Sequence, residues 1–351
     1  MRRLATVQQI SELRPIEGAD AIEVARINGW DVVVKKGDFK TDEMVVFCEV
    51  DSFLPIQPEY EFLRKSSYKK MSDGTEGFRL RTIRLRGQLS QGLLINYQTL
   101  ISKIPPDENG RIPLPDVGED VTEIMGIIKY EPPIPACLAG QAKGNFPGFL
   151  NKTDEERVQN IRSSMYERYR NKGNKYYITE KLDGSSCSIY LRGNEFGVCS
   201  RNLNLLETPD NTFWKVARQY NIEEILREHS NYSGFQTICL QGELIGEGVQ
   251  KNPYNIKGHE FHIFNLYLSD LDYYANIDEL IEFTQRYNLK HVPLLYKDIN
   301  LHENSKACLE LSEGKSKLNS NTEREGIVIR YFDRSVSFKA ISNKFLEKNS
   351  D

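Results

Sequence analysis

The chain has 351 residues, a length typical of two domains. It carries 46 lysines and arginines against 50 aspartates and glutamates, and this net charge of -4 argues against a protein that coats a polyanion over its whole surface, while leaving room for a local basic patch. The sequence has no apolar run of about 18 residues that could cross a membrane and no secretory signal at its N-terminus, so we expect a cytoplasmic protein.

The first third of the chain predicts a small β-barrel. Three apolar-rich stretches, at 21–35, 43–54 and 77–95, are separated by Gly, Pro and Asp. Short strands interrupted at this density are typical of small barrels. We therefore assign residues 1–130 to a first domain.

A proline-rich connector at 130–135 marks the boundary, and residues 131–351 predict a second, mixed domain. Its first helix is expected at 154–170, with Thr153 as the N-cap. Further helices are expected at 212–229, 277–287 and 305–318. Strands are expected at 175–179, 187–192, 198–201, 235–244, 260–268, 326–331 and 335–340.

The sharpest local feature is Lys181, which ends a strand-like run and is followed by Asp183-Gly184. A lysine amine beside a tight turn can act as a nucleophile if burial or neighbouring cations lower its pKa from about 10.4. On its own the Lys-x-Asp-Gly pattern is weak, because a solvated lysine at a β-turn has the same sequence.

Five more short motifs follow in the same region, and they change that assessment. They are Ser200-Arg201-Asn202, Leu240–Gly246 with Glu243, Phe261–Leu266 with Phe264, Glu325–Arg330, and Ser335–Ala340 with Lys339. In order, spacing and residue type, the six motifs resemble those of the covalent nucleotidyltransferase superfamily, which comprises ATP-dependent DNA ligases, RNA ligases and mRNA capping enzymes.

The resemblance implies that Lys181 attacks the α-phosphate of a nucleoside triphosphate, forms a lysyl-phosphoramidate and releases pyrophosphate. It also implies Mg²⁺ or Mn²⁺, held by Glu243 and Glu325, with Asp183 as a water-mediated ligand. Phe264 would stack on the purine, Arg201 would contact phosphate or ribose, and Lys339 would bind a phosphate and lower the pKa of Lys181. The implied nucleotide-binding residues are Glu180, Lys181, Leu182, Arg201, Glu243, Phe264, Glu325 and Lys339.

The length of the chain and its first domain narrow the resemblance further. Lys339 lies 12 residues from the C-terminus, which leaves no room for the C-terminal OB domain of capping enzymes and classical DNA ligases. Stretches at 16–20, 29–37 and 79–92 resemble Deinococcus-type RNA ligases, which place an OB-fold module before a minimal nucleotidyltransferase domain. The expected fold class is α+β: an N-terminal OB-type β-barrel followed by a nucleotidyltransferase domain built on antiparallel sheet.

A basic segment in the first domain supports a nucleic-acid partner. Between Arg64 and Arg86 there are eight basic residues and two acidic ones. Strand alternation sends Arg79 and Arg81 to one face, and Arg84 and Arg86 repeat the pattern. A basic face on an OB-type barrel follows a nucleic-acid backbone, so we expect these four arginines to contact nucleic acid.

These features predict a monomeric, ATP-dependent RNA ligase that seals 5′-phosphate and 3′-OH ends through lysyl-AMP and adenylylated 5′-end intermediates. The substrate implied by the resemblance is a nicked duplex with an RNA 3′-OH strand, and the role is RNA repair. The alternatives are a GTP-dependent capping-type nucleotidyltransferase and a non-catalytic OB-type RNA-binding protein. Two positions depart from the nick-sealing pattern: Ser186 replaces an asparagine, and the last motif keeps one lysine, with Lys344 as a candidate substitute.

Overall fold

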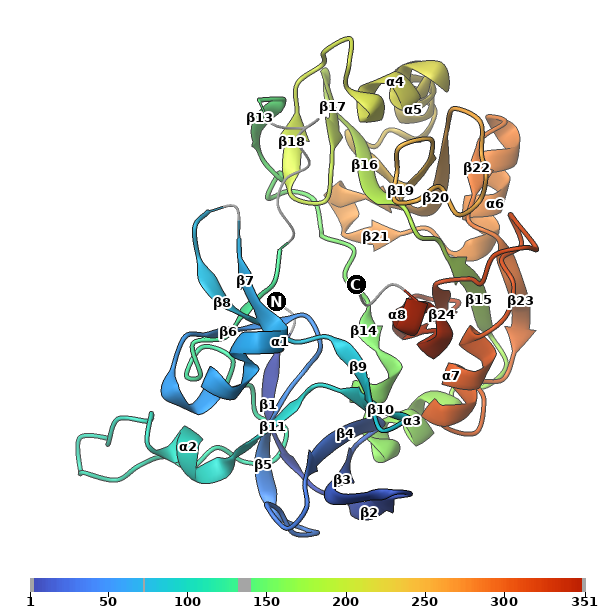
Figure 1. Ribbon diagram of the computed structural model, residues 1–351. Coiled ribbons are helices and arrows are strands. Elements are labelled where there is room, and N and C mark those ends of the chain that lie inside the picture. The colour runs from blue at the N-terminus through green and yellow to red at the C-terminus, as the bar shows by residue number, and fades with distance from the viewer. Residues whose placement is uncertain (1–2, 72, 132–139, 349–351) are drawn as a thin grey trace. The chain divides into compact units, whose positions relative to one another are not determined.

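The computed structural model describes residues 3–71, 73–131 and 140–348. The chain divides into two compact units (Figure 1). The first consists of Met1–Ile134, Gln159–Ser163 and Leu346–Asp351, and the second of Pro135–Val158 and Ser164–Phe345. The expected boundary after residue 130 stays a prediction, and residues 132–135 of the proline-rich connector lie outside the described residues. No helix in the described part of the chain has both the length and the apolar character needed to cross a membrane.

In the described part of the first unit, short antiparallel strands form four small sheets. Their orders are β1-β5-β11, β2-β3-β4, β12-β6-β8-β7 and the β9-β10 hairpin. The strands are β1 (Ala5–Gln9), β2 (Glu12–Ile16), β3 (Ala19–Ile27), β4 (Trp30–Lys35), β5 (Met44–Cys48), β6 (Ser52–Pro55), β7 (Tyr68–Lys70), β8 (Glu76–Arg79), β9 (Thr82–Leu85), β10 (Gln88–Gln91), β11 (Leu93–Asn96) and β12 (Ile128–Lys129). Helices α1 (Arg64–Ser67) and α2 (Tyr97–Ile101) and a 3-10 helix (Pro58–Leu63) complete the unit.

Apolar side chains of these sheets form the core of the first unit. Trp30 is fully buried, and its ring lies 5.8 Å from that of Phe47. The Trp30 indole N–H donates a hydrogen bond to Asn160 Oδ1 at 2.6 Å, which ties the 159–163 segment to this unit. The apolar stretch at 21–35 becomes two strands because Asn28, with φ of 49°, makes a tight turn with Gly29.

In the described part of the second unit, the strands form two sheets. One has the order β13-β18-β17-β16-β19-β20-β21, with β22 beside β20, and the other has the order β14-β25-β24-β15-β23. All pairs are antiparallel except β14–β25 and β20–β22. The strands are β13 (Ala142–Asn145), β14 (Glu156–Arg157), β15 (Tyr176–Lys181), β16 (Ser185–Arg192), β17 (Glu195–Cys199), β18 (Leu203–Leu205), β19 (Thr237–Gly246), β20 (His259–Leu268), β21 (Tyr273–Tyr274), β22 (Lys290–His291), β23 (Leu294–Ile299), β24 (Gly326–Tyr331) and β25 (Ser337–Ile341).

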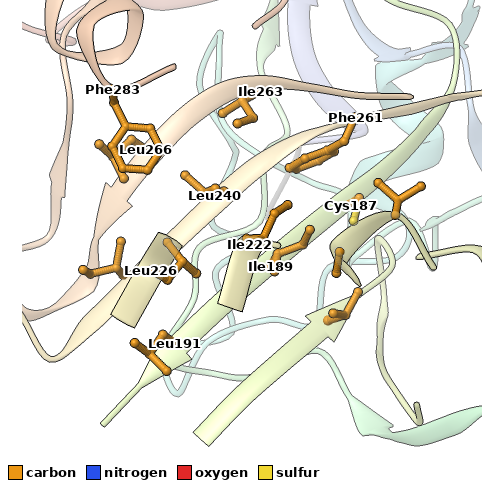
Figure 2. Packing of buried hydrophobic residues seen from close by; sticks show 14 of the residues in the cluster. Cys187, Ile189, Leu191, Ile222, Leu226, Leu240, Phe261, Ile263, Leu266 and Phe283 are labelled. Atoms are coloured by element: carbon orange, nitrogen blue, oxygen red, sulfur yellow. The ribbon is translucent and has the colours of Figure 1, made fainter. Parts of the chain in front are cut away.

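Amphipathic helices cover the larger sheet. Ile222 and Leu226 of α5 and Phe283 of α6 lie in one buried cluster with Leu240 and Ile189 of the sheet (Figure 2). Burial of each such side chain stabilises the fold by about 1.5–3 kcal/mol. The helices wholly within this unit are α4 (Thr212–Gln219), α5 (Ile222–Ser233), α6 (Ile277–Arg286) and α7 (Ser305–Ser312), with a 3-10 helix at Ser269–Leu271. Helices α3 (Ser163–Arg170) and α8 (Asn343–Lys348) and the 3-10 helix Val158–Asn160 have residues in both units.

Three predicted helices differ from the structure. The helix expected at 154–170 begins only at Ser163, because Glu156–Arg157 instead pairs with β25 as strand β14. The helix expected at 212–229 is two helices, α4 and α5, separated at Asn221, whose φ of 51° is left-handed. The helix expected at 305–318 ends at Ser312.

Candidate active site

Strand β15 ends at Lys181, and its neighbour β24 begins beside it (Figure 1). The register pairs Lys181 with Gly326, so Glu325, one residue before β24, comes within reach. The Lys181 amine donates a hydrogen bond to Glu325 Oε2 at 2.7 Å. The two side chains are 28% and 15% exposed, so this ion pair is much less screened than one at the surface.

The second strand pair of the site is β16–β19, which places Glu243 opposite Ser186. Burial raises the pKa of Glu243 to about 8, and the charges of Glu325 and Asp183 act in the same direction. Burial and Glu325 likewise raise the pKa of Asp183 to about 6. The structure thus brings Lys181, Asp183, Glu243 and Glu325 into one electrostatically coupled cluster.

The pKa of Lys181 shifts in the direction opposite to our expectation. Burial alone would lower the pKa of the amine, but the charges of Glu325 and Glu243 outweigh burial and raise it. We expected Lys339 to lower it, but the largest neighbouring charges, those of Glu325, Glu243 and Asp183, all raise it. Lys339 itself lies on β25, opposite Val328 of β24.

The carboxylate cluster fits a divalent cation by its chemistry. Its oxygen donors are those that Mg²⁺ and Mn²⁺ prefer, and the pKa values of Asp183 and Glu243 are raised mainly by burial, with neighbouring carboxylates acting in the same direction. Within the described residues, however, no three His, Cys, Asp or Glu side chains stand at metal-ligand spacing. Glu243, Glu325 and Asp183 would therefore hold an ion that keeps some of its waters, as Mg²⁺ commonly does.

Two of these carboxylates stand beside glycines at which main chains approach closely. A β-carbon at Gly242, next to Glu243, would lie 2.6 Å from the carbonyl oxygen of His262. A β-carbon at Gly326, next to Glu325, would collide with the carbonyl oxygen of Ala340. Any residue other than glycine would push the strands apart at these points.

Arg201 lies just after β17, at a small pocket that also contains Ser186 and Ser188 of β16. Its guanidinium donates hydrogen bonds to both carboxylate oxygens of Asp154, at 2.8 and 3.0 Å. The positive charge of Arg201 also acts on Glu243, against the upward pKa shift that burial causes there, which places Arg201 near the cluster. Lys152 lines the same pocket. Sequence reasoning missed Lys152 and Asp154 because they belong to none of the six motifs.

Glu180 directly precedes Lys181 and is almost fully buried. Its Oε2 accepts a hydrogen bond from the Lys317 backbone N–H at 2.8 Å. Its Oε1 has no partner among the described residues. Since a buried acceptor without a donor costs free energy, this oxygen is suited to a donor on a bound ligand. Burial raises the pKa of Glu180.

An apolar cluster packs around Leu182, in the turn that follows Lys181. Leu182 is 2% exposed and packs with Ile245, Tyr254 and Val292, and Phe264 contacts this cluster from β20. The Tyr254 hydroxyl accepts a hydrogen bond from the backbone N–H of Asp183 at 2.6 Å. Tyr254 is a third residue that sequence reasoning missed, because it lies in an irregular loop.

The four basic-face arginines of the first unit differ in their surroundings. Arg79 pairs with Asp51 at 3.3 Å and lies over the ring of Tyr130, 4.4 Å from its centre. Arg84 forms an ion pair with Glu347. Arg81 donates to the Ser66 carbonyl at 3.4 Å, and Arg86 is exposed at the β9–β10 turn.

An OB-type unit joined to a sheet-rich unit with a lysine among carboxylates defines the class of ligase-type nucleotidyltransferases. Residues 4–97 match the family model of an OB-fold domain, and residues 174–341 match the RNA ligase family model. The chain belongs to the RNA ligase family. The expected fold class, an α+β protein with an N-terminal OB-fold, is confirmed.

Solved structures of Naegleria gruberi RNA ligase resemble the whole chain. The structure with PPi has a TM-score of 0.86 at 40% identity, covering 99% of both chains. A variant with ATP and Mn has a TM-score of 0.86 at 41% identity, and another with AMP and Mn has 0.87 at 41%, each covering 100% of both chains. A search of curated proteins found no match.

Proposed function

We propose that this protein is an ATP-dependent RNA ligase that seals 5′-phosphate and 3′-OH ends at nicks in duplexes whose 3′-OH strand is RNA. The observation that carries the proposal is the ion pair of Lys181 with Glu325 inside a cluster with Glu243 and Asp183. This cluster joins a nucleophilic amine to oxygen ligands for a divalent cation. The Naegleria gruberi RNA ligase was solved with ATP and Mn, AMP and Mn, or PPi, which are the substrate and products of such a transfer.

In the first step the deprotonated Lys181 amine forms a P–N bond with the α-phosphate of ATP, and the bond to pyrophosphate breaks. Glu325 holds the amine in place before the reaction. A bound Mg²⁺ or Mn²⁺ would neutralise the carboxylates and stabilise the charge that develops on the phosphate. Arg201 can contact a phosphate with its planar guanidinium once it leaves Asp154. AMP then passes to the 5′-phosphate, and the 3′-OH displaces it.

The buried Glu180 oxygen supports adenine over guanine. Oε1 is an acceptor without a donor among the described residues. The adenine 6-amino group supplies a donor, whereas guanine presents a carbonyl oxygen at the same position, which would repel the carboxylate. Phe264, half-buried on β20 of the other sheet, would stack on the base.

The nucleotide choice is tested by labelling the protein with ATP and with GTP, each radioactive at the α-phosphate. We expect an acid-labile adduct with ATP and at least about tenfold less with GTP, because a lost or repulsive hydrogen bond in a buried site costs about 1–3 kcal/mol. Preference for GTP would instead support a capping-type enzyme. The absence of any adduct would support a non-catalytic RNA-binding protein.

The first unit is proposed to bind the RNA backbone through basic side chains that stay exposed. Lys69 on β7 and Arg86 at the β9–β10 turn are exposed, and neither forms an ion pair with a described residue. Arg79 and Arg84 are already paired with Asp51 and Glu347, so their charges are partly neutralised. The monomeric state and the cytoplasmic location stay predictions.

Charge reversal tests this basic surface. We expect Lys69→Glu and Arg86→Glu to weaken binding to a nicked RNA duplex and to reduce the salt slope by about 1 for each phosphate that the protein no longer neutralises. Lys36→Glu changes the charge equally at another exposed position of the first unit and is the control. Binding is measured by fluorescence anisotropy from about 50 to 200 mM salt. If Lys36→Glu weakened RNA binding as much as the two test variants, binding would depend only on the net charge of the protein and not on this surface.

A further inference from the structure

The loop between β19 and β20 contacts the turn that follows Lys181, residues 181–184, which is called the nucleophile turn below. The Tyr254 hydroxyl accepts from the Asp183 N–H at 2.6 Å, and Gln250 Nε2 donates to the Gly184 carbonyl at 3.1 Å. One loop therefore bonds the main chain of two consecutive residues that follow Leu182. These main-chain bonds are independent of the carboxylate cluster described above.

The loop is itself firmly held. The Asn252 amide donates to the Ile256 carbonyl at 2.9 Å and accepts from the Ile256 N–H at 3.1 Å. Asn319 donates to the Pro253 carbonyl at 2.9 Å, which anchors the loop to the segment before β24. Tyr254 is 5% exposed, so its ring is packed in the core.

The backbone of the loop is unusual. Three of its residues have a left-handed backbone, a conformation that residues other than glycine adopt much less often. The φ values are 48° at Gln250, 44° at Asn252 and 54° at Asn255. Such conformations persist only where surrounding contacts impose them, and they gather at functional sites. Here the strained segment carries both of the side chains that bond the nucleophile turn.

We propose that the loop Glu247–Gly258 positions Lys181 and Asp183 for adenylylation, with Tyr254 and Gln250 as positioning residues. This inference rests on the proposed function. A turn that can rotate about the Asp183 backbone would move the Asp183 carboxylate and the neighbouring Lys181 away from each other. Fixing the Asp183 N–H and the Gly184 carbonyl removes that freedom, and positioning errors of about 1 Å cost on the order of 100-fold in rate.

The test uses Tyr254→Phe, which keeps the ring in the core and removes only the hydroxyl. We expect the single-turnover rate of Lys181–AMP formation to fall about tenfold, while the ATP concentration for half-maximal rate changes less than about twofold. Gln250→Met, which removes the other hydrogen bond, should give a smaller fall in rate. Because Gln250 is not in the core, this variant tests the loop even if Tyr254→Phe folds poorly.

The control is Tyr166→Phe, which removes a hydroxyl from a tyrosine that is equally buried, at 4% exposure. That hydroxyl donates to the His302 carbonyl at 3.0 Å, also lies 3.0 Å from Cys308 Sγ, and makes no bond to the nucleophile turn. We expect Tyr166→Phe and Tyr254→Phe to lower Tm by similar amounts, with only the latter losing rate. Equal rates in the two variants would overturn the inference.

A second readout needs no activity. Hydrogen exchange of the peptide spanning residues 181–186, measured without nucleotide, should become faster in Tyr254→Phe and stay unchanged in Tyr166→Phe. Unchanged exchange in both variants would show that the loop does not hold the turn, and would overturn the inference. If the wild type forms no AMP adduct, the proposed function fails, while the exchange result still shows whether Tyr254 holds the turn.

Discussion

Lys181→Ala is expected to abolish the covalent adduct with ATP, with no labelled protein above background. The amine supplies the lone pair that forms the P–N bond, and alanine has no group that replaces it. The measurement is incubation with ATP radioactive at the α-phosphate and Mg²⁺ or Mn²⁺, followed by denaturing electrophoresis.

The later chemistry provides the control for this variant. In the final step the 3′-OH attacks an already adenylylated 5′ end, and the Lys181 amine is not the nucleophile. Lys181→Ala given a pre-adenylylated nicked duplex should therefore retain measurable sealing, which would show that the variant is folded and binds RNA. An adduct that persists in Lys181→Ala would place the nucleophile elsewhere and contradict the proposed site.

Arg330→Met is expected to lower the free energy of unfolding by about 3 kcal/mol, because it leaves the carboxylate of Glu155, only 19% exposed, without its guanidinium partner. Arg330 on β24 is 4% exposed and donates to Glu155 Oε1 at 2.8 Å. Ser337 on β25 donates to the other oxygen of Glu155 at 2.6 Å. This network joins the segment before β14 to the strand that follows Glu325, so its removal should also impair adenylylation.

The matched control is Lys315→Met, which removes a cation from an ion pair of similar length, 2.6 Å to Glu323. Lys315 is 55% exposed, so its replacement should cost less than about 1 kcal/mol. Unfolding is followed in urea by tryptophan fluorescence. A change for Arg330→Met as small as that of the control would mean that the buried pair contributes nothing net. Adding Glu155→Gln to Arg330→Met should recover part of the stability, because it removes the unpaired charge.

The same pair predicts a pH dependence. Burial alone would raise the pKa of Glu155, but the charge of Arg330 and the hydrogen bond from Ser337 outweigh it and hold the pKa below its ordinary value, with Arg334 acting in the same direction. The contribution of the Arg330–Glu155 pair to folding stability is therefore complete at neutral pH. It is lost as the pH falls through the pKa of Glu155 in the folded state. The stability difference between wild type and Arg330→Met should shrink below about pH 4.

The fold and the centre of the site could be predicted because their signals are local in the sequence. Each of the six motifs lies on a strand or at a strand end, so the alternation of apolar and polar residues and the turn residues locate it. The resemblance to the family then accounts for the order of the motifs along the chain. Lys181, Glu243 and Glu325 were found in this way. The pairing of β15 with β24 brings Lys181 to Glu325, and the short turn from β15 to β16 leads to Ser186, which pairs with Glu243. Strand boundaries at Gly326–Tyr331 were predicted without error.

The features that could not be predicted depend on contacts between segments that are far apart in the sequence and that no local sequence pattern reveals. The stretch at 154–170 has helical periodicity, yet its first residues form β14 because the buried Arg330 binds Glu155. The pairing of Arg79 with Asp51 changes which basic residues stay available to a ligand. The direction of the Lys181 pKa shift follows from nearby carboxylates. The sequence alone does not give the distances between these carboxylates and the Lys181 amine.

Gly242 and Gly326 limit which substitutions the sequence of this protein can accept during evolution. At Gly242 the main chain of β19 closely approaches that of β20, and at Gly326 the main chain of β24 closely approaches that of β25, so each glycine helps to fix the acid beside it against the neighbouring strand. Many side chains elsewhere can drift without altering these two close approaches. The addition of a single methyl group at Gly242 or Gly326 would alter them, although neither residue has a side chain with which to touch a substrate. Selection should therefore guard these two glycines as strictly as the acids they accompany.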